Sequence, residues 1–365
     1  MTFPVDYNSI SQRVEMVDPV RYGKTRNFID GDVTYLSPYI SRGVLTLTQV
    51  RDIVLKKGYK PYQVEKFLQE LAWREFFQRV WFAKGTALFS DLKQTQSDVV
   101  HEQMIAAVAD AQTGIVALDE QINHLYETGY MHNHARMYVA GITCNIGKAY
   151  WRAPSRWMYY YLLDGDLASN TCSWQWVAGS FSSKKYIANQ ENINRYLKSN
   201  QQHSFLDHTY ENIFNQPVPD VLKETTNLSL TTTLPQTDEG FTIDASKDVC
   251  IYTSYWLNPQ WREEEDCNRI LLLEPSHFEQ FPVSEKVMAF ITALATANIP
   301  GIQFFTGSFE ELQQQLQPHQ KIYFIDHPLH RHFKGWADAY PWMFPQISGS
   351  FSSFFSFWKK AERHL

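Results

Sequence analysis

The most informative part of the chain is LLDGDLASNTCSWQW, residues 162–176, where two carboxylates flank a glycine ahead of a tryptophan-rich run. Asp164 and Asp166 can both pair with an upstream arginine, Arg136, in a setting of low dielectric constant. Buried charges require such partners. We therefore expect this stretch to contribute to a polar ligand site.

Arg136 belongs to MHNHARM, residues 131–137, which we expect to be helical. Asn133 and Met137 are neighbours four positions apart on one helix face. His132 and His134 invite a metal or acid–base interpretation. Because two histidines in an HxH pattern on a helix point to different faces, we predict no metal site here.

A second polar face comes from ELAWREFF within residues 62–82, whose apolar residues recur at helical intervals. Glu70, Trp73, Arg74 and Phe77 share one side of that helix. A carboxylate, an indole and a guanidinium on one stripe favour a ligand site. The alternative is a Glu70–Arg74 ion pair beside a half-buried tryptophan.

A third cluster, TYLSPY at residues 34–39, precedes Ser41, Arg42 and Gly43. Hydroxyls and backbone N–H groups at the start of a helix suit phosphate oxygens. The alternative is an ordinary helix start with Pro38 in the first turn.

The pattern along the chain predicts two domains. Residues 1–215 are mainly helical, with helices over 62–82, 116–128 (ending before Gly129), 131–150 and 155–163. Residues 216–246 are rich in Pro and Thr and are expected to be a linker. Residues 247–365 alternate short β-rich runs (249–256, 269–275, 302–307 and 321–327) with helices over 283–297 and 308–316. This alternation predicts a small α/β, Rossmann-like domain with a parallel sheet.

Composition narrows the class of protein. The chain has 365 residues, 24 Phe, 20 Tyr, 11 Trp and only four Cys, with no CxxC spacing. These aromatic rings can fill a core, stack on flat ligands or carry electrons. Without a signal peptide or a long apolar run, we expect a cytoplasmic protein with reduced thiols and no membrane association.

Charge is uneven along the chain. The formal net charge is −6, yet residues 1–215 carry 22 Lys and Arg against 21 Asp and Glu. The excess of acidic residues lies in residues 216–365, which carry 11 basic and 18 acidic side chains. Net charge therefore does not exclude a nucleic-acid surface on the helical domain.

Taken in order, these motifs resemble the FAD-binding helical domain of the cryptochrome/photolyase flavoproteins. The resemblance covers about residues 20–200 and implies FAD as the cofactor. It implies that the following residues contact FAD: Tyr22, Thr34, Tyr35, Leu36, Ser37, Arg74, Arg136, Asp164, Asp166 and Asn170. Arg136 and Asp164 would form an ion pair against the flavin ring, and Asn170 would face flavin N5.

The resemblance also implies a site for a cyclobutane pyrimidine dimer flipped out of DNA. Its residues would be Glu70, Trp73, Asn133, Met137 and Trp176, with Arg26 and His134 facing the DNA. His134 stands where photolyases usually carry an arginine. Residues 177–196 also depart from the family's usual sequence.

An electron relay to the flavin would begin with Trp174 and Trp151. The position of the third, surface tryptophan of the family falls at Asp98. Tyr150, Trp157 and Trp81 are the alternatives for its role.

The family's α/β antenna domain normally precedes the FAD-binding domain. Here, residues 250–259 and 268–305 look similar to that domain, moved to the C-terminal side. The region would either bind a second antenna chromophore or serve as a scaffold that binds none.

The resemblance implies a photolyase that repairs cyclobutane pyrimidine dimers by electron transfer from excited, reduced FAD, with damaged DNA as its partner. One alternative is a cryptochrome-like blue-light photoreceptor that binds FAD and signals through a protein partner without DNA repair. Another is a light-independent flavoprotein with a structural role.

Overall fold

The computed structural model describes residues 2–365, which form two compact units. The first unit comprises residues 2–17, 34–76 and 230–365, and the second comprises residues 18–33 and 77–229. The predicted fold class, a mainly helical domain plus a small α/β domain with a parallel sheet, is confirmed. The domain ranges expected from composition stay a prediction.

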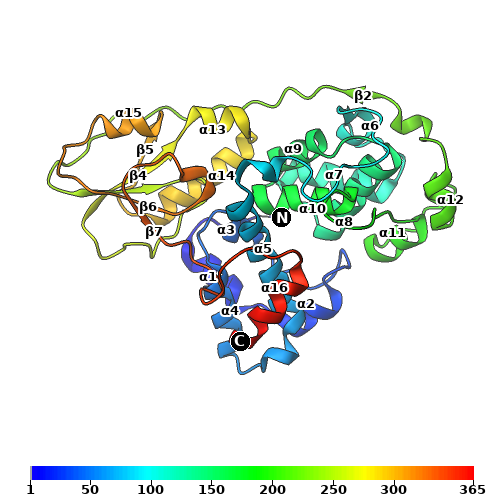
Figure 1. Ribbon diagram of the computed structural model, residues 1–365, viewed down its shortest axis with the longest axis horizontal. Helices are drawn as coiled ribbons and strands as arrows, with labels where there is room; N and C mark the ends of the chain where they lie inside the picture. Colours follow the sequence, from blue (N-terminus) through cyan, green and yellow to red (C-terminus); the bar gives the residue numbers. More distant parts are fainter. Residues whose placement is uncertain (1) are drawn as a thin grey trace. The chain divides into compact units, whose positions relative to one another are not determined.

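A five-stranded parallel sheet is the centre of the α/β part of the first unit (Figure 1), with strand order β5–β4–β3–β6–β7. Its strands are β3 (Asp248–Tyr252), β4 (Cys267–Leu273), β5 (Gln303–Thr306), β6 (Ile322–Ile325) and β7 (Trp336–Asp338). The register pairs Ile251 with Ile270 and Val249 with Ile322. Since parallel strands need crossover connections, helices α13 (Pro275–Gln280), α14 (Glu285–Asn298) and α15 (Phe309–Gln313) fall between them.

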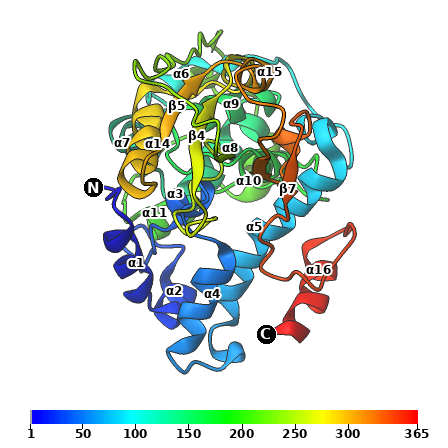
Figure 2. The ribbon, with the colours of Figure 1, turned by 90° about the vertical axis from the view of Figure 1, so that its left-hand side faces the viewer.

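The alternation of side chains along β3 and β4 fixes the core beneath this sheet. Val249, Ile251, Ile270 and Leu272 point to one face, where they form a buried cluster with Phe309 and Leu312 of α15. Figure 2 shows α14 and α15 beside the strands. The four strands predicted from the β-rich runs are therefore present, although β3 ends at Tyr252 rather than at Trp256.

The remainder of the first unit is helical. It contains α1 (Tyr7–Glu15), α3 (Ser37–Ser41), α4 (Leu47–Lys56), the first part of α5 (Glu65–Lys84) and α16 (Phe354–Ala361). Thr46 and Gln49 form a reciprocal capping box at the start of α4. The helix predicted over 62–82 corresponds to α5.

The second unit is almost entirely helical. Its helices are α2 (Pro19–Thr25), the rest of α5, α6 (Ala106–Ala109), α7 (Val116–Thr128), α8 (Asn133–Gly141), α9 (Arg152–Tyr161), α10 (Leu167–Ala178), α11 (Gln190–Leu197) and α12 (Tyr210–Asn215). Gly129 ends α7 in the left-handed conformation, with φ 74°, as its position predicted. A large apolar core includes Trp151, Trp157 and Trp174.

One local prediction needs correction in this unit. The single helix expected over 131–150 is α8 followed by a π-helical turn, Ile142–Ile146. Helical structure stops there because Gly147 and Lys148, with its positive φ of 61°, do not continue it. Residues 216–246 include strand β2 (Thr225–Thr226), which pairs antiparallel with β1 (Met104–Ile105), and their role as a linker stays a prediction. In residues 2–365, no helix is long and apolar enough to cross a membrane.

Candidate flavin-binding site

The predicted ion pair between Arg136 and Asp164 is present in the second unit. Nη2 of Arg136 donates to both carboxylate oxygens of Asp164, at 3.0 and 2.9 Å. The carboxylate side chain is only 4% exposed. Nε of Arg136 donates to the carbonyl of Met131 at 2.8 Å, and its guanidinium lies 5.5 Å from the ring centre of Tyr130. The pair thus holds Asp164 at a defined place beside Arg136 of α8.

The second carboxylate, Asp166, caps α10. It accepts from the N–H of Ser169 at 2.6 Å and from Nε2 of Gln78 at 2.6 Å. Asp166 and Gln78 are both buried. Two polar atoms beside this contact, Oε1 of Gln78 and Oγ of Ser169, are buried without a hydrogen-bond partner among the described residues. Since buried polar groups are normally paired, these atoms indicate room for a polar ligand.

Asn170 lies one residue further along α10. Its side-chain Nδ2 donates to the carbonyl of Ser155 at 2.8 Å. This bond orients the amide, so that Oδ1 is the atom able to accept a hydrogen bond from a ligand.

The predicted phosphate segment lies in the first unit. Tyr35 has a positive φ of 53°, and α3 begins at Ser37 with Pro38 in its first turn. Oγ1 of Thr34 accepts from the N–H of Leu36 at 3.4 Å. Tyr22, expected nearby, lies on α2 of the second unit.

The polar stripe on α5 also belongs to the first unit. Arg74 donates to Oγ of Ser41 on α3. Trp73 is half-buried, and its ring stacks on Phe354 of α16 with the centroids 3.8 Å apart and the planes 8° apart. Glu70 is half-buried one turn before it.

The remaining predicted lesion residues lie in the second unit. Asn133 is exposed at the first turn of α8, and Met137 packs one turn later against the core. Trp176 on α10 contacts Phe181 edge to face, with the centroids 6.0 Å apart.

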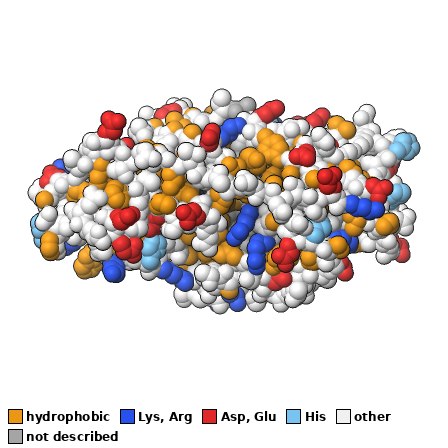
Figure 3. Space-filling model, turned by 90° about the horizontal axis from the view of Figure 1, so that it is seen from above, with side chains coloured by type: hydrophobic (Ala, Val, Ile, Leu, Met, Phe, Trp, Pro, Cys, Tyr) orange, Lys and Arg blue, Asp and Glu red, His pale blue; other side chains and the backbone are white. Residues whose placement is uncertain are grey.

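The two residues predicted to face DNA are His134, on α8, and Arg26. His134 stacks on Tyr196 at 4.7 Å, and burial together with the nearby Arg26 lowers the pKa of His134 to about 4. It is therefore neutral at pH 7 and brings no positive charge. Arg26 donates to the carbonyl of Gly23 at 3.0 Å. Acidic and basic side chains are interspersed on the face shown in Figure 3.

The two relay tryptophans are buried. Nε1 of Trp151 donates to Oδ1 of Asp91 at 2.7 Å, and the Tyr150 hydroxyl donates to the same oxygen at 3.3 Å. The rings of Trp151 and Tyr150 are 5.5 Å apart. Tyr150 is half-buried, whereas Trp157 and Trp81 are nearly inaccessible. Tyr150 is thus the candidate that reaches solvent.

Gln78 and Asp91 were not predicted from the sequence. Gln78 follows Arg74 by one turn on the same helix face, and this spacing was the available signal. Asp91 lies after the 3-10 helix η2 (Gly85–Phe89), 60 residues from Trp151, and no sequence spacing connects the two.

Residues 67–221 match the family described as the FAD binding domain of DNA photolyase. The chain is 32% identical over 157 residues to the deoxyribodipyrimidine photo-lyase of Streptomyces griseus, covering 41% of this chain and 33% of the relative. It is 30% identical over 169 residues to that of Synechococcus sp., covering 44% and 35%. This stretch of the chain is therefore similar to the FAD-binding domain of photolyases, and FAD is the cofactor that the match indicates.

Among solved structures, a cryptochrome from Synechocystis sp. is 22% identical, with 61% of this chain and 49% of that chain covered and a TM-score of 0.48. The alignments with the two curated relatives span about a third of the relatives' length.

Proposed function

We propose that this protein is a light-dependent flavoprotein that repairs cyclobutane pyrimidine dimers in DNA. The proposal is supported chiefly by the buried polar cradle of Asp164, Asp166 and Gln78, which lies within the stretch that matches the photolyase FAD-binding domain. Asn133 and Met137 favour this lesion over the (6-4) photoproduct, for which the family usually has histidines at those two positions.

The chain's residues would bind and orient the cofactor. FAD, when bound, supplies the light-excited electron. Arg136 and Asp164 would present a fixed ion pair to it, and the orphaned Oε1 of Gln78 and Oγ of Ser169 would gain hydrogen-bond partners. Asn170 would accept a hydrogen bond through Oδ1. The Thr34–Ser37 segment would meet the phosphates.

Other side chains would receive the damaged bases. Flipping a dimer out of DNA costs a few kcal/mol, less than for an intact pair, and stacking on Trp73 or Trp176 returns about 1–3 kcal/mol per base. The carboxylate of Glu70 would accept hydrogen bonds from a pyrimidine edge.

Illumination of the reduced, FAD-loaded protein with a dimer-containing single-stranded oligonucleotide should restore thymine absorbance.

Glu70→Ala should weaken dimer binding by about tenfold, the equivalent of one lost charge-assisted hydrogen bond, while FAD content stays unchanged. Glu65→Ala, an exposed residue in the first turn of the same helix, is the matched control. Absence of repair with FAD fully bound would exclude the photolyase proposal. Loss of FAD in Glu70→Ala would show that Glu70 belongs to the cofactor site and not to the dimer site.

We expect the electron path to leave the core through Trp151 and Tyr150. Asp91 accepts hydrogen bonds from both rings and so can take the phenolic proton when Tyr150 is oxidised. Blue-light reduction of the oxidised flavin should therefore slow several-fold in Tyr150→Phe and in Asp91→Asn, as in Trp151→Phe. Trp157→Phe, whose indole donates instead to the Tyr126 hydroxyl, is the control. Equal rates in wild type and Tyr150→Phe would contradict this path.

A cryptochrome-like photoreceptor is the second candidate. It is favoured by the stacking of Phe354 on Trp73, because a ring of the protein itself lies where repair would need a base. In either case, the parallel sheet is the candidate region for a second, antenna chromophore.

A further inference from the structure

Helix α16 presents one apolar face to α5 within the first unit. Its buried residues Phe354, Phe357, Trp358 and Ala361 follow the spacing of a single helical face. Phe354 is 1% exposed and lies flat on Trp73, and both Phe354 and Phe357 contact Phe76. The indole face of Trp73 is therefore covered by a side chain of the chain itself.

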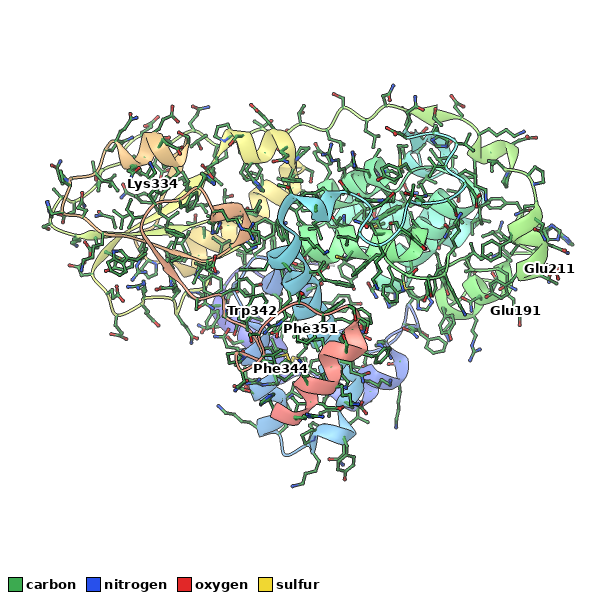
Figure 4. All side chains as sticks on the ribbon, in the orientation of Figure 1. Glu191, Glu211, Lys334, Trp342, Phe344 and Phe351 are labelled. Carbon is green, nitrogen blue, oxygen red and sulfur yellow. The ribbon has the colours of Figure 1, made fainter. Side chains whose placement is uncertain are left out.

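The segment before α16 is fastened to the same helix. The buried carboxylate of Glu75 accepts from the N–H groups of Met343 and Phe344, the latter at 3.3 Å. Arg51 of α4 donates to the carbonyl of Met343. Figure 4 shows Trp342, Phe344 and Phe351 along the chain that leads into α16. This anchor fixes the segment at Met343 and Phe344.

Between Phe344 and the start of α16, the chain contains a short flexible sequence. Residues 348–350, Ser-Gly-Ser, are exposed, and Gly349 has a φ of 88° with no described atom beyond its chain neighbours within 4 Å of the position that a Cβ would take. A glycine at positive φ between small polar residues has little to hold it in one conformation. A hinge at this point would let α16 move while Met343 and Phe344 stay bound to Glu75.

We propose that Phe354 is a specificity-determining residue that competes with a nucleobase for the face of Trp73. This inference rests on the proposed function, in which Trp73 stacks on a pyrimidine of flipped, single-stranded DNA. A stacked aromatic pair contributes roughly a two- to tenfold factor beyond burial, and a base on an indole roughly a five- to hundredfold factor. Because these ranges overlap, Phe354 lowers the affinity for a pyrimidine without abolishing binding, and it excludes ligands that stack weakly.

The test compares variants of the full, FAD-loaded chain by fluorescence anisotropy with a dimer-containing single-stranded oligonucleotide. Phe354→Ala should bind it about tenfold more tightly than wild type, since the competing stack is gone. Phe355→Ala, whose ring is 69% exposed on the same helix, should leave binding unchanged. Phe354→Ala combined with Trp73→Ala should lose the gain, which a purely structural role of Phe354 would not explain.

Phe354→Leu keeps apolar volume but removes the flat ring, so it should also bind the oligonucleotide more tightly than wild type. It replaces Phe354→Ala in the test if that variant fails to fold. FAD content and urea unfolding monitor the folding of both variants. If wild type binds and repairs the dimer and neither Phe354 variant binds more tightly, the competition is excluded while the proposed function stands. If no variant binds or repairs the dimer with FAD fully bound, both proposals fail.

Discussion

Asp164→Asn is expected to lower the free energy of unfolding by about 3 kcal/mol. The substitution leaves the charge of Arg136 without its partner at the nearly inaccessible position of residue 164. Nη2 of Arg136 donates to both carboxylate oxygens, and Nε of the same arginine donates to the Met131 carbonyl, so that the guanidinium cannot turn to solvent without losing this further bond. We also expect the variant to purify with little FAD. Urea unfolding and the flavin absorbance per protein measure the two effects.

The matched control is the exposed ion pair of Lys223 and Asp220, whose side chains are 60% and 96% accessible. Asp220→Asn should not change stability measurably, because solvent-exposed pairs contribute little. If Asp164→Asn unfolds at the same urea concentration as wild type and retains FAD, then the pair is neither a structural nor a cofactor-binding element.

Acid is expected to destabilise the first unit well above the pH at which carboxylates titrate. Burial lowers the pKa of His277 to about 3 and that of His330 to about 4, and it also lowers the pKa of His327. The rings of His327 and His330 lie 5.1 Å apart, while Arg42 opposes a charge on His277 and His332 opposes one on His330. Nε2 of His277 is buried without a hydrogen-bond partner in the described chain.

These histidines are neutral in the folded protein and bind protons in the unfolded chain first, so their contribution is complete above about pH 6.5 and is lost as the pH falls toward 4. A histidine whose pKa falls to about 4 loses about 2 kcal/mol of stabilisation between pH 7 and pH 5. Urea unfolding at pH 5, 6 and 7 measures the slope. His277→Phe should flatten it, and substitution of the exposed His319 by Gln should not. An identical slope in His277→Phe and wild type would show that this cluster does not govern acid stability.

Much of the fold could be predicted because periodicity reports which side of an element is buried. Helix α7 and its Gly129 cap, helix α5 and four of the sheet's five strands follow from local patterns. Strand β7 was missed because Trp336 and Ala337 are exposed at the edge of the sheet and show no alternation. Helix α16 was missed because FSSFFSFW mixes serines with aromatic rings that lie on both the buried and the exposed side of the helix, which hides its helical spacing.

The sequence by itself determined the resemblance of the helical region to the photolyase/cryptochrome flavoproteins, and through it the expected pairing of Arg136 with Asp164, because these depend on motifs whose residues keep a fixed order and spacing. Only the tertiary structure decided that Gln78 meets Asp166, that Asp91 joins Trp151 and Tyr150, and that Phe354 covers Trp73. Those contacts join residues 59 to 281 positions apart. No local periodicity encodes them, because they form only when the packing of whole helices brings the side chains together.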